Sequence, residues 1–216
     1  MLAVACAAAG ARLVQLSTDY VFPGRVNGAG GTPYEVDDEP GPLSAYGRTK
    51  LAGEQAVHDT LIRAASVVRT AWVYGAAGTN FVKTMATLER TSDTVGVVAD
   101  QTGSPTWAAD LAEALLALCR SDAPRGTYHA TNQGAASWHR LAQAVFVELG
   151  ADPARVLPTD SSILLRPAHR PAYSVLSPTS WSAAGLPPLP TWLSALTAAF
   201  RVDGGYLRGR SEQPPG

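Results

Sequence analysis

Apolar strand-like runs and amphipathic helix-like stretches alternate along most of this chain, and this order constrains its fold more than any other feature. The predicted strands cover residues 13–16, 66–70, 94–98 and 127–130. The predicted helices cover residues 45–58, 80–90, 106–119 and 137–149. Strands joined through helices lie parallel in a sheet, with helices packed on its faces. The sequence therefore predicts the α/β class.

Both ends of the chain depart from this alternation. A short helix over residues 2–9 closes at Gly10 and leads directly into the first strand, so we expect further elements of the fold to precede it. After residue 150, proline interrupts short apolar pieces before a last helix near residues 191–200. These observations divide the chain into a sheet-bearing part (1–150), a small proline-rich lobe (151–202) and a disordered tail (203–216).

Composition excludes several classes of function. Lysine plus arginine (17) nearly balance aspartate plus glutamate (18), so the net charge is −1 and no basic surface for nucleic acid is expected. No apolar run reaches the ~18 residues of a membrane span, which argues against a membrane partner. Cys6 and Cys119 lie far apart and have no other metal ligands at a suitable spacing. We therefore expect no disulfide, no metal site and a cytoplasmic location.

Tyr46 and Lys50 are the first residues that suggest chemistry. They lie four positions apart in a predicted helix, so their side chains share one face. A phenol has a pKa of ~10, and a nearby cation lowers that pKa by ~1 to 3 units. The pair therefore predicts a proton donor beside a positive charge, although a tyrosine and a lysine also occur at this spacing by chance.

Three further blocks share the order and spacing of a known group of enzymes. The first predicted strand ends in STDYVF, at the carboxyl edge where parallel sheets bind ligands, and a long loop over residues 24–43 follows it. Together the four blocks resemble the dTDP-4-dehydrorhamnose reductase group of the extended short-chain dehydrogenase/reductases. The blocks are residues 17–22 (STDYVF), 46–54 (YGRTKLAGE), 68–74 (VRTAWVY) and 100–106 (DQTGSPT).

The resemblance implies a fold and a reaction. The fold is a partial Rossmann-type parallel sheet with helices on both faces and a small carboxyl-terminal substrate lobe. The reaction is reduction of the C4 ketone of dTDP-4-dehydro-L-rhamnose by NADPH, with NADH left open, to give dTDP-L-rhamnose. Tyr46 corresponds to the proton donor, Lys50 to the residue that tunes Tyr46 and holds the nicotinamide ribose, and Thr18 to a hydroxyl that binds the reacting oxygen.

Further residues are expected to contact the nucleotide sugar. Asp19 and Trp72 correspond to substrate contacts, and Trp72 is alternatively a core aromatic at the end of its strand. Asn80 either presents its amide to the diphosphate or serves as an ordinary helix N-cap. Gln101 and Arg170 are expected at the nucleotide part, or else on the solvated surface.

The sequence also departs from the family. The family opens with a strand, a Gly-x-x-Gly-x-x-Gly turn and a helix that bind the cofactor pyrophosphate, and this chain has none of them, so we expect it to lack about 90 residues. A catalytically silent regulatory or scaffold homologue is therefore an alternative, as is a related epimerase or dehydratase. Tyr20 argues against dehydration, because similar dehydratases have an Asp-Glu pair at this point. A homodimer is left open.

Overall fold

A three-stranded parallel sheet forms the centre of the structure, a computed structural model that describes residues 1–24, 31–163 and 170–209. The strands follow the order β1-β2-β7, and their bounds are Leu13–Thr18, Ala65–Thr70 and Thr127–His129. Thr18 lies beside Thr70 in the register, so β1 and β2 end at the same edge. The α/β class is therefore confirmed.

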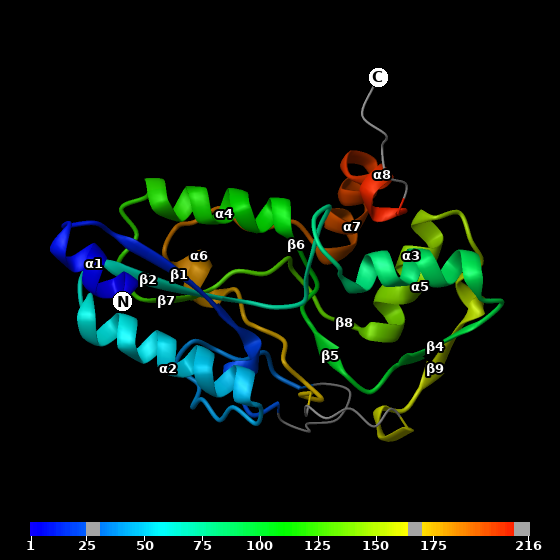
Figure 1. The fold of residues 1–216 in the computed structure, drawn as a ribbon, viewed down its shortest axis with the longest axis horizontal. Helices are drawn as coiled ribbons and strands as arrows, with labels where there is room; N and C mark the ends of the chain where they lie inside the picture. Colours follow the sequence, from blue (N-terminus) through cyan, green and yellow to red (C-terminus); the bar gives the residue numbers. More distant parts are fainter. Residues whose placement is uncertain (25–30, 164–169, 210–216) are drawn as a thin grey trace.

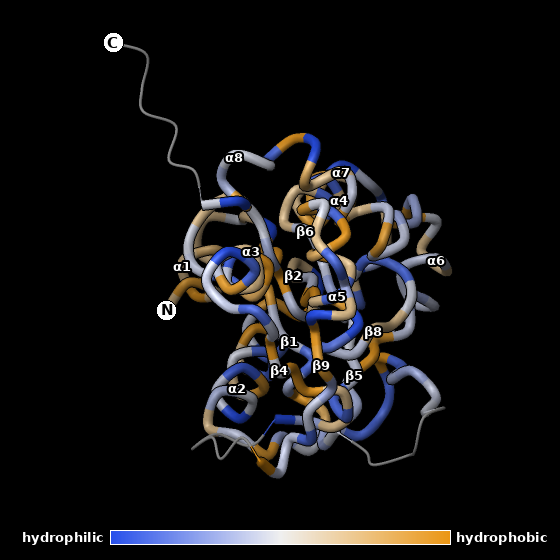
Figure 2. The backbone as a smooth tube through the Cα atoms, turned by 90° about the vertical axis from the view of Figure 1, so that its right-hand side faces the viewer, coloured by the Kyte–Doolittle hydropathy of each residue, from blue (hydrophilic) through white to orange (hydrophobic). Residues whose placement is uncertain are grey.

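Helices cover both faces of this sheet (Figure 1). On one face, Leu13 and Val67 pack beneath α1 (Leu2–Ala8) and α2 (Ala45–Thr60). On the other, Val68 and Tyr128 pack beneath α4 (Ala108–Arg120) and α6 (Thr179–Ala183). Successive strand residues point to opposite faces, which is why each strand feeds both layers. Figure 2 shows strand backbones near the middle of the molecule, with most helices around them.

The strand predicted over residues 94–98 does not join the central sheet. It is β4 (Val95–Val98), which pairs in parallel with β9 (Val156–Thr159) in a separate two-stranded sheet. Val95 and Val97 pack in a second core with residues of α5 (Trp138–Glu148) and α7 (Trp192–Val202). Pro158 lacks a backbone N–H and is tolerated because β9 has one strand neighbour among the described residues.

Short strands lie between the central sheet and the second sheet formed by β4 and β9. Two pairs of two-residue strands link the layers: β3 (Val73–Tyr74) with β6 (Thr106–Trp107), and β5 (Thr102–Gly103) with β8 (Ala136–Ser137). Other elements are helix α3 (Phe81–Thr91) and the 3-10 turns η1 (Asp19–Val21), η3 (Pro153–Arg155) and η4 (Ser161–Ile163). Within the described ranges, no helix is long and apolar enough to cross a membrane.

Several helix starts follow their capping residues closely. Three residues predicted to begin a helix are instead its N-cap, and each accepts a hydrogen bond from a backbone N–H of the first turn. They are Asn80, Ser137 and Thr191. The start predicted at Thr106 is wrong. Thr106 and Trp107 extend β6 beside β3, and α4 begins at Ala108.

Two segments predicted without packed structure contain buried residues. In the long loop, Tyr34 stacks on Phe22 at 4.3 Å and pairs with Leu176, while residues 25–30 lie outside the described part. In the tail, Gly204–Leu207 form helix α8, whose Leu207 is fully buried in the second core. Arg90 also donates to the Arg208 carbonyl, so both apolar and polar contacts hold this turn, and residues 210–216 lie outside the description.

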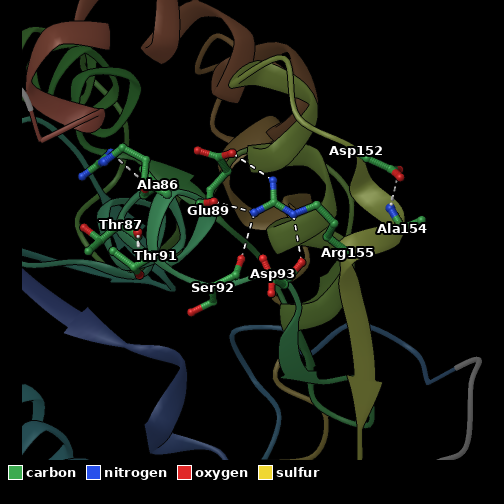
Figure 3. Close-up of polar contacts among 10 residues, drawn as sticks. Ala86, Thr87, Glu89, Thr91, Ser92, Asp93, Asp152, Ala154 and Arg155 are labelled. Atoms are coloured by element: carbon green, nitrogen blue, oxygen red, sulfur yellow. Dashed lines mark hydrogen bonds and ion pairs between the residues drawn. The ribbon is translucent and has the colours of Figure 1, made fainter.

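Arg155 joins the second sheet to the end of α3 (Figure 3). Its guanidinium donates to Glu89 Oε1 at 3.0 Å and to the carbonyls of Glu89, Ser92 and Asp93. The last carbonyls of a helix have no partner within the helix, and a cation placed there also opposes the negative end of its dipole. Arg155 therefore serves as the C-terminal cap of α3.

We predict that Arg155→Ala lowers the free energy of unfolding by about 1–2 kcal/mol, because a half-exposed charged donor with several acceptors is lost. Urea unfolding measures the change. Arg63→Ala is the control, because this exposed arginine has no such set of acceptors among the described residues. Equal stability of the two variants would contradict the capping role.

Candidate functional site

The candidate site begins where β1 ends. The Thr18 hydroxyl accepts a hydrogen bond from the Tyr20 backbone N–H at 3.2 Å and donates one to Asp19 Oδ1 at 3.0 Å. Both contacts are local, because the strand turns directly into the 3-10 turn Asp19–Val21. They fix the hydroxyl of Thr18 at the carboxyl edge of the sheet, which is the ligand-binding edge of open α/β folds.

Asp19 is a buried carboxylate. It is 2% exposed, and its Oδ2 atom makes no hydrogen bond with the described residues. Desolvation raises the pKa of Asp19 to about 6, and the nearby Ser174 and Thr18 hydroxyls oppose this only in part. The Asp19 carboxylate is covered and accepts the Thr18 hydrogen bond, and its predicted contact with substrate stays a prediction.

The first turn of α2 lies against this strand end. Ser44 caps the helix by accepting the Gly47 N–H at 3.0 Å. A Cβ atom at Gly47 would lie 2.2 Å from the carbonyl oxygen of Tyr20, so only glycine permits this approach. The neighbouring Tyr46 ring meets Tyr20 edge-on, with 5.9 Å between ring centroids. The Tyr-x-x-x-Lys segment is thereby set beside Thr18 and Asp19.

Tyr46 and Lys50 present complementary groups at this edge. Tyr46 is 54% exposed, so its phenol is open to a ligand. Lys50 is half-buried, and its Nζ donates to the Leu16 carbonyl of β1 at 2.5 Å. An exposed acid, a fixed cation and an ordered hydroxyl are the groups that a carbonyl reduction requires, because the alkoxide must be stabilised and then protonated.

Trp72 follows β2 and is held on several sides. It is the one non-glycine residue with a positive φ (46°) among the described residues, a strained conformation that often marks functional sites. Its ring stacks on Trp138 with centroids 3.5 Å apart, and a Cβ at Gly103 would lie 2.4 Å from the ring. The structure therefore gives Trp72 aromatic packing beside the site, whereas its contact with substrate stays a prediction.

The other predicted contacts lie farther along the chain. Asn80 serves as the N-cap of α3: its Oδ1 accepts the Lys83 N–H at 3.1 Å, and its Nδ2 donates to the Gly75 carbonyl at 2.8 Å. Gln101 and Arg170 are half-buried and precede two segments that pair at Thr102 and Tyr173. Their contacts with a nucleotide stay predictions.

Sequence reasoning missed the pair that anchors α2 to the sheet. Glu54 of α2 and Arg69 of β2 form a buried ion pair at 2.8 Å. Glycine inside the Tyr-x-x-x-Lys segment was a usable signal for the close approach of α2, whereas nothing local in the sequence joins residues 54 and 69.

His129 lies edge-on to Phe22, and burial together with the Arg69 charge lowers the pKa of His129 to about 3. The imidazole is therefore neutral at physiological pH.

No group of three or more His, Cys, Asp or Glu residues in the described ranges has the geometry to hold a metal ion. A shallow hollow beside Tyr46 has mainly apolar walls, and its lining comes from both sides of the loop after β1. The lining residues are Tyr20, Phe22, Pro23, Leu43, Ser44 and Pro171. The site thus combines polar groups at the strand ends with an apolar neighbour.

Comparisons with known proteins show the family to which the chain belongs. A family model described as the RmlD substrate binding domain matches residues 1–203. The chain is 54% identical to dTDP-4-dehydrorhamnose reductase from Streptomyces griseus, over 99% of this chain and 69% of that protein. It is 48% identical to dTDP-4-keto-6-deoxy-D-glucose reductase from Streptomyces niveus, over 92% of this chain and 67% of that protein.

A solved structure supports the same relationship. The crystal structure of dTDP-4-dehydrorhamnose reductase from Bacillus anthracis, in complex with NADP, superposes with a TM-score of 0.86 at 38% identity. The match covers 93% of this chain and 69% of that one. Across the curated relatives matched at 48% identity or more, the chain spans 60% to 69% of their length.

The close approach at Gly47 generates a matched pair of variants on one helix. Gly47→Ala should lower the free energy of unfolding by about 1–3 kcal/mol, because its Cβ meets the Tyr20 backbone. Gly53→Ala should raise the same quantity by about 0.5–1 kcal/mol, because nothing lies within 4 Å of its Cβ. Denaturant unfolding compares them, and equal effects would contradict the account of this contact.

Because Asp19 is buried, we predict that Asp19→Asn raises the free energy of unfolding by an amount that depends on pH. The folded pKa lies near 6 and the reference value is 3.8, so ionisation opposes folding above about pH 6 and ceases to do so below about pH 4. The variant should therefore be more stable at pH 7, by on the order of 2–3 kcal/mol, and the gain should vanish towards pH 4. Thermal unfolding across this range tests it against Asp59→Asn, an exposed control. A gain independent of pH would refute the burial argument.

Proposed function

The chain belongs to the dTDP-4-dehydrorhamnose reductase family, and on this premise we propose that it carries the proton-donating half of a dTDP-sugar 4-ketoreductase. The observation that carries the proposal is the placement of the exposed Tyr46 phenol beside the strand end that holds Thr18, with the Lys50 ammonium fixed one helical turn away. The class of reaction is reduction of a 4-keto group to an alcohol.

Each of these side chains has a defined task in that reaction. Tyr46 donates its phenolic proton to the oxygen at C4 as the carbonyl becomes an alkoxide. Thr18 positions that oxygen by turning its one hydroxyl proton from Asp19 Oδ1 to the C4 oxygen, while the Tyr20 N–H keeps the oxygen of Thr18 in place. The Lys50 charge, held close to the Leu16 carbonyl, stabilises negative charge that develops at Tyr46.

The cofactor proposed is NADPH, which supplies the hydride when bound. The relative from Bacillus anthracis was solved in complex with NADP. Lys50 fits the nicotinamide end, because a half-buried ammonium at the carboxyl edge of a parallel sheet can donate to ribose hydroxyls. NADH stays the alternative, because no described residue identifies a 2′-phosphate site.

The sugar proposed is dTDP-4-dehydro-L-rhamnose. This choice is supported by the 54% identity to dTDP-4-dehydrorhamnose reductase from Streptomyces griseus. Trp72, Asn80, Gln101 and Arg170 are proposed to contact other parts of the nucleotide sugar.

We also place the protein in the cytoplasm, in keeping with its free cysteines, and its assembly as a homodimer stays a prediction.

The proposal predicts that Tyr46→Phe lowers kcat by at least ~10²-fold, the scale of a lost general acid, with little change in KM. Loss of NADPH absorbance in the presence of dTDP-4-dehydro-L-rhamnose measures both constants. Tyr206→Phe is the control, because Tyr206 is a comparably exposed tyrosine on α8. Full activity in Tyr46→Phe would remove Tyr46 from the reaction. If the wild-type protein binds NADPH and still shows no turnover, a silent regulatory or scaffold role replaces the proposed reaction.

A further inference from the structure

One stripe of α2 crosses all three strands of the central sheet. Polar residues recur there every four positions, and each contacts the next element across the sheet. Tyr46 meets Tyr20 of η1, and Lys50 donates to the Leu16 carbonyl of β1. Farther along, Glu54 pairs with Arg69 of β2, and His58 Nε2 lies 3.2 Å from Thr127 Oγ1 of β7. These contacts fix both the direction and the rotation of the helix on the sheet.

Arg69 is the most connected member of this arrangement. Its Nε and Nη2 atoms donate to the Glu54 carboxylate at 2.8–3.2 Å, and Nη1 donates to the Val36 carbonyl at 3.1 Å. Its guanidinium also lies over the Phe22 ring, 5.0 Å from the centroid. Phe22 directly follows the turn that begins with Asp19. Arg69 therefore contacts the helix of Tyr46 and Lys50, the loop after β1 and the segment that follows Thr18.

The burial of this pair indicates a positional role. The side chains of Arg69 and Glu54 are 6% and 4% exposed, so both charges have lost most of their hydration. Desolvation offsets most of the attraction within such a pair, and apolar residues of similar size often replace buried ion pairs without loss of stability. What an apolar pair lacks is the fixed geometry of a bidentate guanidinium–carboxylate contact.

We propose that the Glu54–Arg69 ion pair is a positioning device, which sets Tyr46 and Lys50 in register with Thr18. The expected loss of kcat rests on the proposed function, whereas the expected change in the position of α2 does not. Glu54 is two turns from Tyr46 on the same helix, and Arg69 is one residue before Thr70, the strand partner of Thr18. A small rotation of α2 would change the position of the Tyr46 phenol relative to the Thr18 hydroxyl.

The test replaces the pair with residues of similar size and no charge, in the double variant Glu54→Met with Arg69→Met. We expect a folded protein whose kcat falls about 10- to 100-fold, the scale of a small misplacement of reacting groups, while KM for the dTDP-sugar changes less than about 3-fold. Backbone amides of residues 45–50 should exchange hydrogen at least about 10-fold faster. Glu89→Met with Arg155→Met is the control, because it removes the partly exposed ion pair on α3.

Each outcome decides the proposal. A folded double variant with wild-type kcat and wild-type exchange overturns it, and so does an equal loss of kcat in the control pair. If the double variant does not fold, Glu54→Gln is judged by the same criteria, and Arg69→Lys should restore more kcat than Arg69→Met. If wild-type protein binds NADPH but shows no reductase activity, the proposed function fails. Whenever no activity is measured, hydrogen exchange at residues 45–50 alone decides: faster exchange in the double variant supports the positioning role, and unchanged exchange overturns it.

Discussion

The contact between the backbone of Gly47 and the carbonyl of Tyr20 is the constraint on which the site depends. It brings the first turn of α2 so close to the end of β1 that no larger residue fits. Thr18 and Tyr46, which lie 28 positions apart in the sequence, are thereby placed at one edge of the sheet. The hydrophobic clusters on either side determine that α2 packs on the sheet, and this contact determines how closely.

Three ionisable side chains near the end of β1 and beneath α2 are buried, although apolar side chains could fill the same space. Asp19 is held in a desolvated position where burial raises its pKa, and the Glu54–Arg69 pair is almost completely removed from water. Neither arrangement is an efficient source of stability, since buried charges must first lose their hydration. Stability comes instead from the apolar clusters beneath α2, α4, α5 and α7. The buried charges are better understood as fixing side-chain geometry around the reacting groups.

Local sequence signals predicted the elements better than their partners. Capping residues such as Asn80 and Ser137 marked helix starts to within one residue, and the four-residue spacing placed Tyr46 and Lys50 on one face. Pairing of β4 with β9 could not be predicted, because nothing in a four-residue apolar run specifies a strand about 60 residues away. The same holds for Trp72 on Trp138 and Glu54 on Arg69, where the contact exists only once the sheet has formed. The ordered turn at residues 204–207 was missed because a single buried leucine gives no periodic pattern.

The most direct test of this account is a structure of the protein with the dTDP-sugar bound. The account predicts that the oxygen at C4 of the sugar lies within hydrogen-bond reach, about 2.6–3.2 Å, of both the Tyr46 phenol and the Thr18 hydroxyl. It also predicts that the Lys50 contact with the Leu16 carbonyl persists or is exchanged for a ribose hydroxyl. A sugar bound away from the end of β1, with neither Tyr46 nor Thr18 at its C4 oxygen, would contradict it.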